Sequence, residues 1–102
     1  MKAIIKRAFE PVGRLIDIPN ELKPLQQAVG GYLEAVTLAS DLAILCDEEG
    51  RLKGKIHNCT ICGYEFVGTI LAVGVDGEEF ADVPITLEQW ERMVVGTGGV
   101  YA

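Results

Sequence analysis

The pattern of apolar and polar positions in the first half of the chain predicts four short strands. Two runs of β-compatible residues, Lys2–Phe9 and Arg14–Ile18, are separated by a Pro-Gly turn and predict an opening hairpin. Strands are also predicted over Tyr32–Ala39 and Leu42–Cys46. Because Leu42–Cys46 is almost continuously apolar, we expect both of its faces to be buried in the centre of a sheet.

The second half of the chain is less regular. Residues 51–64 show no clear hydrophobic period, because glycine and polar residues interrupt every pattern. Phe66–Val75 predicts one long apolar strand, in which Gly68 and Gly74 mark a bulge or close packing. Glu78–Val83 follows an Asp-Gly turn and predicts a short returning strand.

Two helices carry clear boundary signals. For the first, Asn20 is a suitable N-cap, and Gly30-Gly31 is a typical stop. The second helix should begin at Thr86, which forms a capping box with Gln89, and should end at Gly96. Between these signals, apolar residues recur at helical spacing, giving Leu22, Leu25, Ala28 and Val29 in the first helix and Leu87, Trp90, Met93 and Val94 in the second. Ile85 precedes the cap of the second helix and pairs with Trp90 as a hydrophobic staple.

The order of these elements predicts an α+β fold. Several strands followed by single helices, without regular βαβ alternation, indicate a mostly antiparallel sheet of about five to six strands with two short helices packed on it. The length of 102 residues suits a single domain spanning residues 1–102. Residues 96–102 are glycine-rich and follow the last helix, so we expect a mobile tail there.

Charge narrows the classes of partner. The chain has 15 acidic and 9 basic residues and a formal net charge of −6, which disfavours direct binding to a nucleic-acid backbone. No apolar run is long enough for a membrane span, and the patch near Met1 is too short for a secretion signal. We therefore expect a protein of the cytoplasm that does not associate with membranes.

One group of residues has the composition of a metal site. All three cysteines and the sole histidine lie within seventeen residues, and a Cys₃His set would complete a tetrahedral zinc shell. The four residues are Cys46, His57, Cys59 and Cys62. However, structural zinc sites usually show two Cys-x-x-Cys knuckles, and this chain has one. The sequence therefore predicts free thiols and no cofactor, with a zinc-stabilised module as an alternative.

The sequence gives little support for a set of catalytic residues. Ser40 is the only serine, and no nucleophile elbow surrounds it. Asp47, Glu48 and Glu49 form a run beside Gly50, which is typical of a solvated turn and does not provide the two different environments that an acid–base pair needs. We therefore expect a protein that works by binding and is not an enzyme.

From Val29 onward the chain resembles a family of unknown function. The resemblance rests on Val29-Gly30-Gly31-Tyr32-Leu33-Glu34-Ala35-Val36 and on Cys46-Asp47-Glu48-Glu49-Gly50-Arg51-Leu52-Lys53-Gly54, and it continues through Asn58, Val67–Ile70 and Thr86–Gln89. That family occurs in bacteriophages, prophages and plasmids. The chain departs from the pattern where the family usually has Asn in place of Asp47 and Leu-Pro-x-Asn-Arg in place of Lys55–Cys59.

The resemblance implies a gene of a mobile element, and small acidic proteins in that setting often blunt host defence. The first hypothesis is an inhibitor that contacts a host protein, such as a defence nuclease, through the acidic turns Asp47–Glu49 and Asp76–Glu79. The second is an oligomeric sponge for a signalling nucleotide. Its phosphate contacts would come from the amides of Gly30 and Gly31 and from Lys53, Lys55 and Asn58. Tyr32 and Tyr64 have polar tips and could line a shallow ligand groove, with packing at a buried edge as the alternative.

Overall fold

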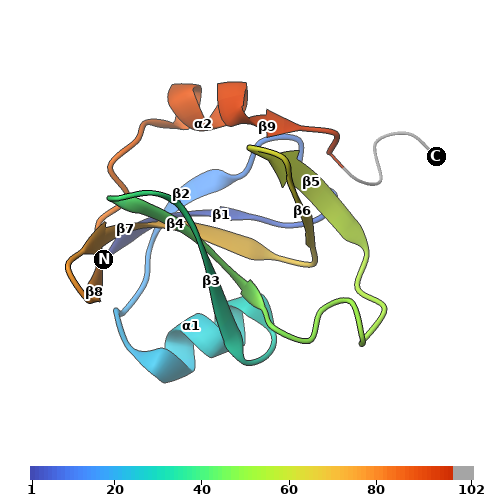
Figure 1. Cartoon of the computed structure of the whole chain (residues 1–102), viewed down its shortest axis with the longest axis horizontal. Helices are drawn as coiled ribbons and strands as arrows, with labels where there is room; N and C mark the ends of the chain where they lie inside the picture. Colours follow the sequence, from blue (N-terminus) through green and yellow to red (C-terminus); the bar gives the residue numbers. More distant parts are fainter. Residues whose placement is uncertain (98–102) are drawn as a thin grey trace.

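The computed structural model describes residues 1–97 as two antiparallel sheets and two helices (Figure 1). The larger sheet has six strands, in the order β2-β1-β7-β4-β3 with β8 also paired to β7, and the smaller has the order β6-β5-β9. The six strands are β1 (Lys2–Lys6), β2 (Arg14–Asp17), β3 (Leu33–Ala39), β4 (Leu42–Asp47), β7 (Ile70–Asp76) and β8 (Glu79–Ala81). The smaller sheet contains β5 (His57–Ile61), β6 (Tyr64–Val67) and β9 (Val94–Val95), and the helices are α1 (Leu22–Val29) and α2 (Leu87–Met93).

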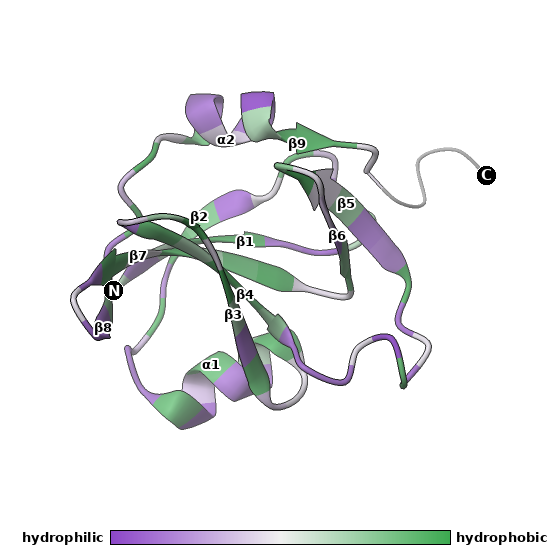
Figure 2. Cartoon of the chain, viewed as in Figure 1, coloured by the Kyte–Doolittle hydropathy of each residue, from purple (hydrophilic) through white to green (hydrophobic). Residues whose placement is uncertain are grey.

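The large sheet is the middle layer of the molecule. Helix α1 covers one of its faces, while the small sheet and α2 cover the other (Figure 1). Hydrophobic residues are concentrated on the strands of the large sheet, whereas the loop after β4 is mostly hydrophilic (Figure 2). Alternate residues of β4 serve the two cores, with Leu45 packing under α1 and Ile44 packing under the small sheet. All six residues of β4 are buried, which confirms its predicted central position.

The α+β fold with a mostly antiparallel sheet is therefore confirmed. The capping box is also confirmed, because the Gln89 amide donates to Thr86 Oγ1 at 3.1 Å and the Thr86 amide donates to Gln89 Oε1 at 2.9 Å. Trp90 is fully buried, its indole donates to the Val12 carbonyl at 2.6 Å, and Ile85 packs in the same cluster. These contacts attach α2 to the turn between β1 and β2.

Two strand predictions are wrong in the second half of the chain. The predicted strand Phe66–Val75 is two strands in different sheets, because Gly68 has φ +71° and turns the chain between β6 and β7. The irregular segment 51–64 contains the strand β5, which forms the centre of the small sheet. The chain thus has a second sheet that hydrophobic periodicity did not reveal.

The helix ends also differ from the prediction. Helix α1 begins after Glu21, while Asn20 donates its side-chain amide to the Phe80 carbonyl at 2.8 Å. Its end is as predicted, with Gly30 in the left-handed conformation at φ +82°. Helix α2 stops at Met93 because Val94 and Val95 pair with β5. Of the predicted tail 96–102, residues 98–102 lie outside the described residues, and the Gly96 carbonyl is 2.7 Å from His57 Nε2.

Candidate functional site

A buried ionic cluster joins the end of β4 to the end of α1. The Asp47 side chain is 1% exposed, and its Oδ2 lies 2.9 Å from Lys53 Nζ and 2.8 Å from Lys55 Nζ. Its Oδ1 accepts a hydrogen bond from the Glu49 amide at 2.9 Å. Burial alone would raise the pKa of Asp47, but the hydrogen bonds from Lys55, Lys53 and the Glu49 amide outweigh it and hold the pKa well below its usual range.

The same lysines bind the last carbonyls of α1. Lys55 Nζ donates to the Val29 carbonyl at 2.8 Å, and Lys53 Nζ donates to the Gly30 carbonyl at 3.2 Å. Cations are favourable at this end of a helix, where the backbone dipole is negative. The amides of Gly30 and Gly31 both donate to the Gln26 carbonyl, at 2.8 and 3.1 Å. Four of the predicted phosphate contacts, the two glycine amides and the two lysine side chains, therefore already have hydrogen-bond partners within the chain.

Packing around the Asp47 carboxylate explains Gly31, the second residue of the glycine pair. A Cβ on Gly31 would overlap that carboxylate and lie 2.6 Å from Oδ2, so no larger residue fits without moving Asp47. A Cβ on Gly68 would lie 2.7 Å from the Lys55 Cδ atom, which places the β6–β7 turn against the same lysine. Contacts among Gly31, Asp47, Lys55 and Gly68 thus hold α1, β4 and the small sheet together.

Asn58 belongs to a second buried polar group. It is fully buried on β5, and its Oδ1 accepts from the equally buried Lys6 Nζ at 2.7 Å. Its amide nitrogen donates to the carbonyls of Lys6 at 2.9 Å and Gly68 at 2.7 Å. Burial lowers the pKa of Lys6, although the Coulombic effects of Cys59 and Glu10 oppose this. Asn58 therefore connects the two sheets, and solvent does not reach it.

The remaining predicted residues lie near the surface. Tyr32 is 64% exposed, and Glu48 and Glu49 are exposed beside it. A shallow hollow of about 370 Å³ contains five of the nine residues named from the sequence. It is lined by Lys23, Gln26, Gln27, Gly30, Gly31, Tyr32, Glu49 and Lys53. The structure thus brings Gly30, Gly31, Tyr32, Glu49 and Lys53 together, while the carboxylate of Asp47 is directed inward and is not available to a partner's basic surface.

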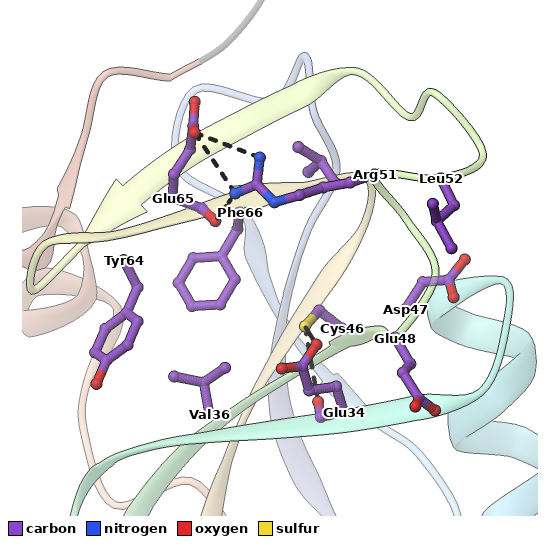
Figure 3. A pocket seen from close by; sticks show the side chains of 11 residues that line it. Glu34, Val36, Cys46, Asp47, Glu48, Arg51, Leu52, Tyr64, Glu65 and Phe66 are labelled. Atoms are coloured by element: carbon purple, nitrogen blue, oxygen red, sulfur yellow. Dashed lines mark hydrogen bonds and ion pairs between the residues drawn. The ribbon is translucent and has the colours of Figure 1, made fainter.

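A second pocket, of about 250 Å³, lies between β3 and β4 on one side and β6 on the other (Figure 3). Val36, Cys46 and Phe66 give it an apolar base, and Tyr64, 50% exposed, stands at its side. Its full lining is Glu34, Val36, Cys46, Asp47, Glu48, Arg51, Leu52, Tyr64, Glu65, Phe66 and Val67. Most of these residues were not named from the sequence, because they come from segments that only the tertiary fold brings together.

The pocket carries an excess of negative charge. Arg51 is paired with Glu65, donating to its backbone carbonyl at 2.9 Å and lying 3.5 Å from its Oε1. Within residues 1–97, neither Glu34 nor Glu48 forms an ion pair. The polar contacts of Glu34 come from the Cys46 thiol, 3.7 Å from its backbone oxygen and 4.0 Å from Oε1 (Figure 3). A cation entering this pocket would therefore meet carboxylates that are not neutralised.

The cysteines and the histidine do not form one site. Among residues 1–97, no three His, Cys, Asp or Glu side chains are placed to hold a metal ion. Cys62 has φ +50° and forms the two-residue hairpin turn between β5 and β6 with Gly63, so it is exposed while Cys59 is buried on β5. Burial raises the pKa of Cys46 and of Cys59 to about 11, so both thiols are protonated at neutral pH. His57 Nδ1 lies 2.9 Å from Glu65 Oε2.

The layers, the two buried polar groups and the surface pockets define a small α+β domain whose buried polar residues connect its layers. The chain belongs to the family described as domain of unknown function DUF3846, whose model matches residues 1–95. No curated protein matches the chain, and no solved structure does. In the part of the chain that the structure describes, no helix has the length and apolar character needed to cross a membrane.

Proposed function

We propose that this domain is a non-catalytic binding protein of a phage or another mobile element, and that it inhibits a host defence protein by direct contact. The observation that carries the proposal is the open outer edge of β3. This strand has seven residues and stands last in the order of the large sheet, so no described strand pairs with its outer side. Such an edge is a template for pairing with another chain.

The ladder shows which backbone groups of β3 face outward. The Glu48 amide donates to the Tyr32 carbonyl at 2.8 Å, and the register then pairs Glu34 with Cys46 and Val36 with Ile44. In an antiparallel pair, alternate residues exchange both of their hydrogen bonds with the partner strand. The backbone groups of Glu34 and Val36 therefore bind β4, and those of Ala35 between them are directed to the open side.

The sequence of β3 is also unusual for an exposed edge. Soluble proteins protect long edges with charged residues (lysine above all), proline, short strands or β-bulges, and β3 has neither lysine nor proline. Here the strand reads Leu-Glu-Ala-Val-Thr-Leu-Ala, contains one charged residue and keeps Ala35, Thr37 and Ala39 exposed. A bulge between Thr37 and Ala39 is the one irregularity in its register. An edge left open in this way is consistent with a surface whose role is to bind a protein.

Replacing Ala35 with proline should remove an outward amide and leave the β3–β4 ladder intact. The host protein is first identified by a pull-down from host lysate with the wild-type domain and mass spectrometry, and is then purified. We expect the affinity of Ala35→Pro for it to fall by about tenfold or more. The fall in Tm should be less than about 5 °C. Inhibition should be measured with the same purified protein, and the defence phenotype in host cells that express the domain.

Ala35→Ser is the matched control, because it changes the side chain and keeps the amide. Thr37→Lys places a charge on the same edge without altering the backbone, and it replaces the proline variant if that variant does not fold. Full binding and inhibition by folded Ala35→Pro and Thr37→Lys proteins would show that β3 is not the contact surface.

A second candidate function is supported by the hollow beside α1. Five residues named from the sequence line it together with Lys23, and the exposed Tyr32 ring is available for stacking against a base. If the domain sequesters a signalling nucleotide, cyclic nucleotides or ADP-ribose derivatives should raise its Tm, and Tyr32→Ala with Lys23→Ala should abolish the increase. The absence of any Tm change across such a panel would exclude this function.

A further inference from the structure

We infer that the partner supplies an extended segment that adds to β3 as a further strand and places one lysine or arginine side chain in the pocket between β3 and β6. This inference rests on the proposed function and specifies the chemistry of its partner. It joins two observations, the open edge of β3 and the excess of carboxylates in the pocket that the edge borders.

The geometry follows from strand alternation. Side chains of neighbouring strands at matched positions point to the same face, and the strands lie about 4.8 Å apart. Glu34 and Val36 both line the pocket from β3. In the added strand, a residue opposite Glu34 or Val36 would direct its side chain to the same face of the sheet and would lie over the pocket. The residues before and after it would direct their side chains to the opposite face. The pocket thus restricts the basic residue to the positions of the added strand opposite Glu34 and Val36.

The lining matches a long basic side chain. Lysine and arginine combine an apolar stem with a cationic end. Val36 and Phe66 offer apolar surface to the stem, and Glu34 offers a carboxylate to the cation (Figure 3). The Tyr64 ring adds a π-face at the side of the pocket. The volume of about 250 Å³ suits one side chain and is below the range of about 300–1,000 Å³ typical of small-molecule sites.

The charge balance of the lining supports the same occupant. It contains four carboxylates and one guanidinium. Two of the carboxylates have partners, since Asp47 is bound by Lys53 and Lys55 and Glu65 by Arg51. Glu34 and Glu48 remain, so an incoming cation would gain attraction without displacing an existing ion pair. An acidic side chain at the same position would be repelled.

An array of immobilised peptides tests the inference with purified full-length protein. Each peptide has about nine residues of alternating Thr and Val, with every amino acid in turn at the central position. We expect retention of peptides with central Lys or Arg and loss of those with Asp or Glu. Fluorescence anisotropy with a Lys-centred and a norleucine-centred peptide then gives affinities, and only the first should weaken with added salt.

Glu34→Gln should reduce the affinity for the Lys-centred peptide by about tenfold and leave the norleucine-centred peptide unchanged. Glu91→Gln is the matched control, because Glu91 is exposed on α2 and lines neither hollow. Peptide binding without a basic preference would overturn the role of the pocket and leave strand addition in place. Host-protein binding that depends on β3 without any peptide binding would overturn the extended segment and retain the proposed function. Self-association through β3, seen by native mass spectrometry and lost in Ala35→Pro, would assign the edge to a second copy and overturn the inference.

Discussion

Replacing Asn58 with leucine is expected to lower the free energy of unfolding by about 3–5 kcal/mol, the largest effect of any single substitution proposed for this chain. The variant removes the nearer acceptor of the fully buried Lys6 ammonium group, whose other acceptor is the Arg7 carbonyl at 3.5 Å. Among residues 1–97, no carboxylate forms an ion pair with Lys6. The variant also leaves the carbonyls of Lys6 and Gly68 without their donor. Urea denaturation followed by circular dichroism measures the loss, with the slope of the transition as a check on two-state behaviour.

The double variant separates the buried charge from the change in packing. Lys6→Met removes the charge, so Lys6→Met/Asn58→Leu should recover about 1.5–3 kcal/mol relative to the sum of the single variants. A residual loss is expected because the two carbonyls remain without a donor. Additive effects of the two substitutions would show that the ammonium and the amide oxygen do not interact in the folded protein.

Local signals predicted those parts of the fold that depend on neighbours in sequence. The Thr86–Gln89 capping box, the Gly30 helix stop and the buried strand β4 are each encoded within a few residues, and the structure contains all three. Strand β5 has no such signal. Its buried Asn58 breaks the apolar pattern, and the partner that permits its burial, Lys6, lies 52 residues away. The hydrophobic periodicity of a short segment cannot reveal a hydrogen-bond partner so far away in the sequence.

The candidate site was predictable to a similar extent. The sequence predicted phosphate contacts from Lys53, Lys55 and the glycine pair and placed Asp47 in an acidic binding turn, and the fold does bring these residues together. Their contacts, however, are with one another. The pocket between β3 and β6 was missed because its residues are spread over segments separated by the irregular loop. The available signals were Glu34, an isolated carboxylate within an apolar strand, and Tyr64, a tyrosine that could line a ligand groove.

Replacing Asp47 with asparagine is expected to lower the free energy of unfolding by about 3 kcal/mol at neutral pH. The substitution keeps the shape and the acceptor for the Glu49 amide but removes the charge that binds Lys53 and Lys55. Both lysines are partly exposed and can be hydrated in the variant. The expected loss therefore lies at the lower end of the range of about 3–5 kcal/mol for breaking a buried ion pair. A fall in Tm of about 12–24 °C corresponds to this loss in a domain of about 100 residues.

The dependence on pH distinguishes lost charge from lost packing. Because the folded protein holds the pKa of Asp47 below its unfolded value, the ionised carboxylate stabilises the fold fully above that unfolded value, and the stabilisation is lost as pH falls towards the folded pKa. The difference in unfolding free energy between the wild type and Asp47→Asn should therefore be constant above about pH 5 and shrink below it. Asp47→Ala serves as the comparison, because it loses the hydrogen bond from the Glu49 amide as well as the charge. It should therefore be less stable than Asp47→Asn, and this difference should remain at acidic pH, where the wild-type carboxylate becomes protonated. A difference between wild type and Asp47→Asn that persists unchanged into acid would mean that the two lysines do not hold this carboxylate ionised.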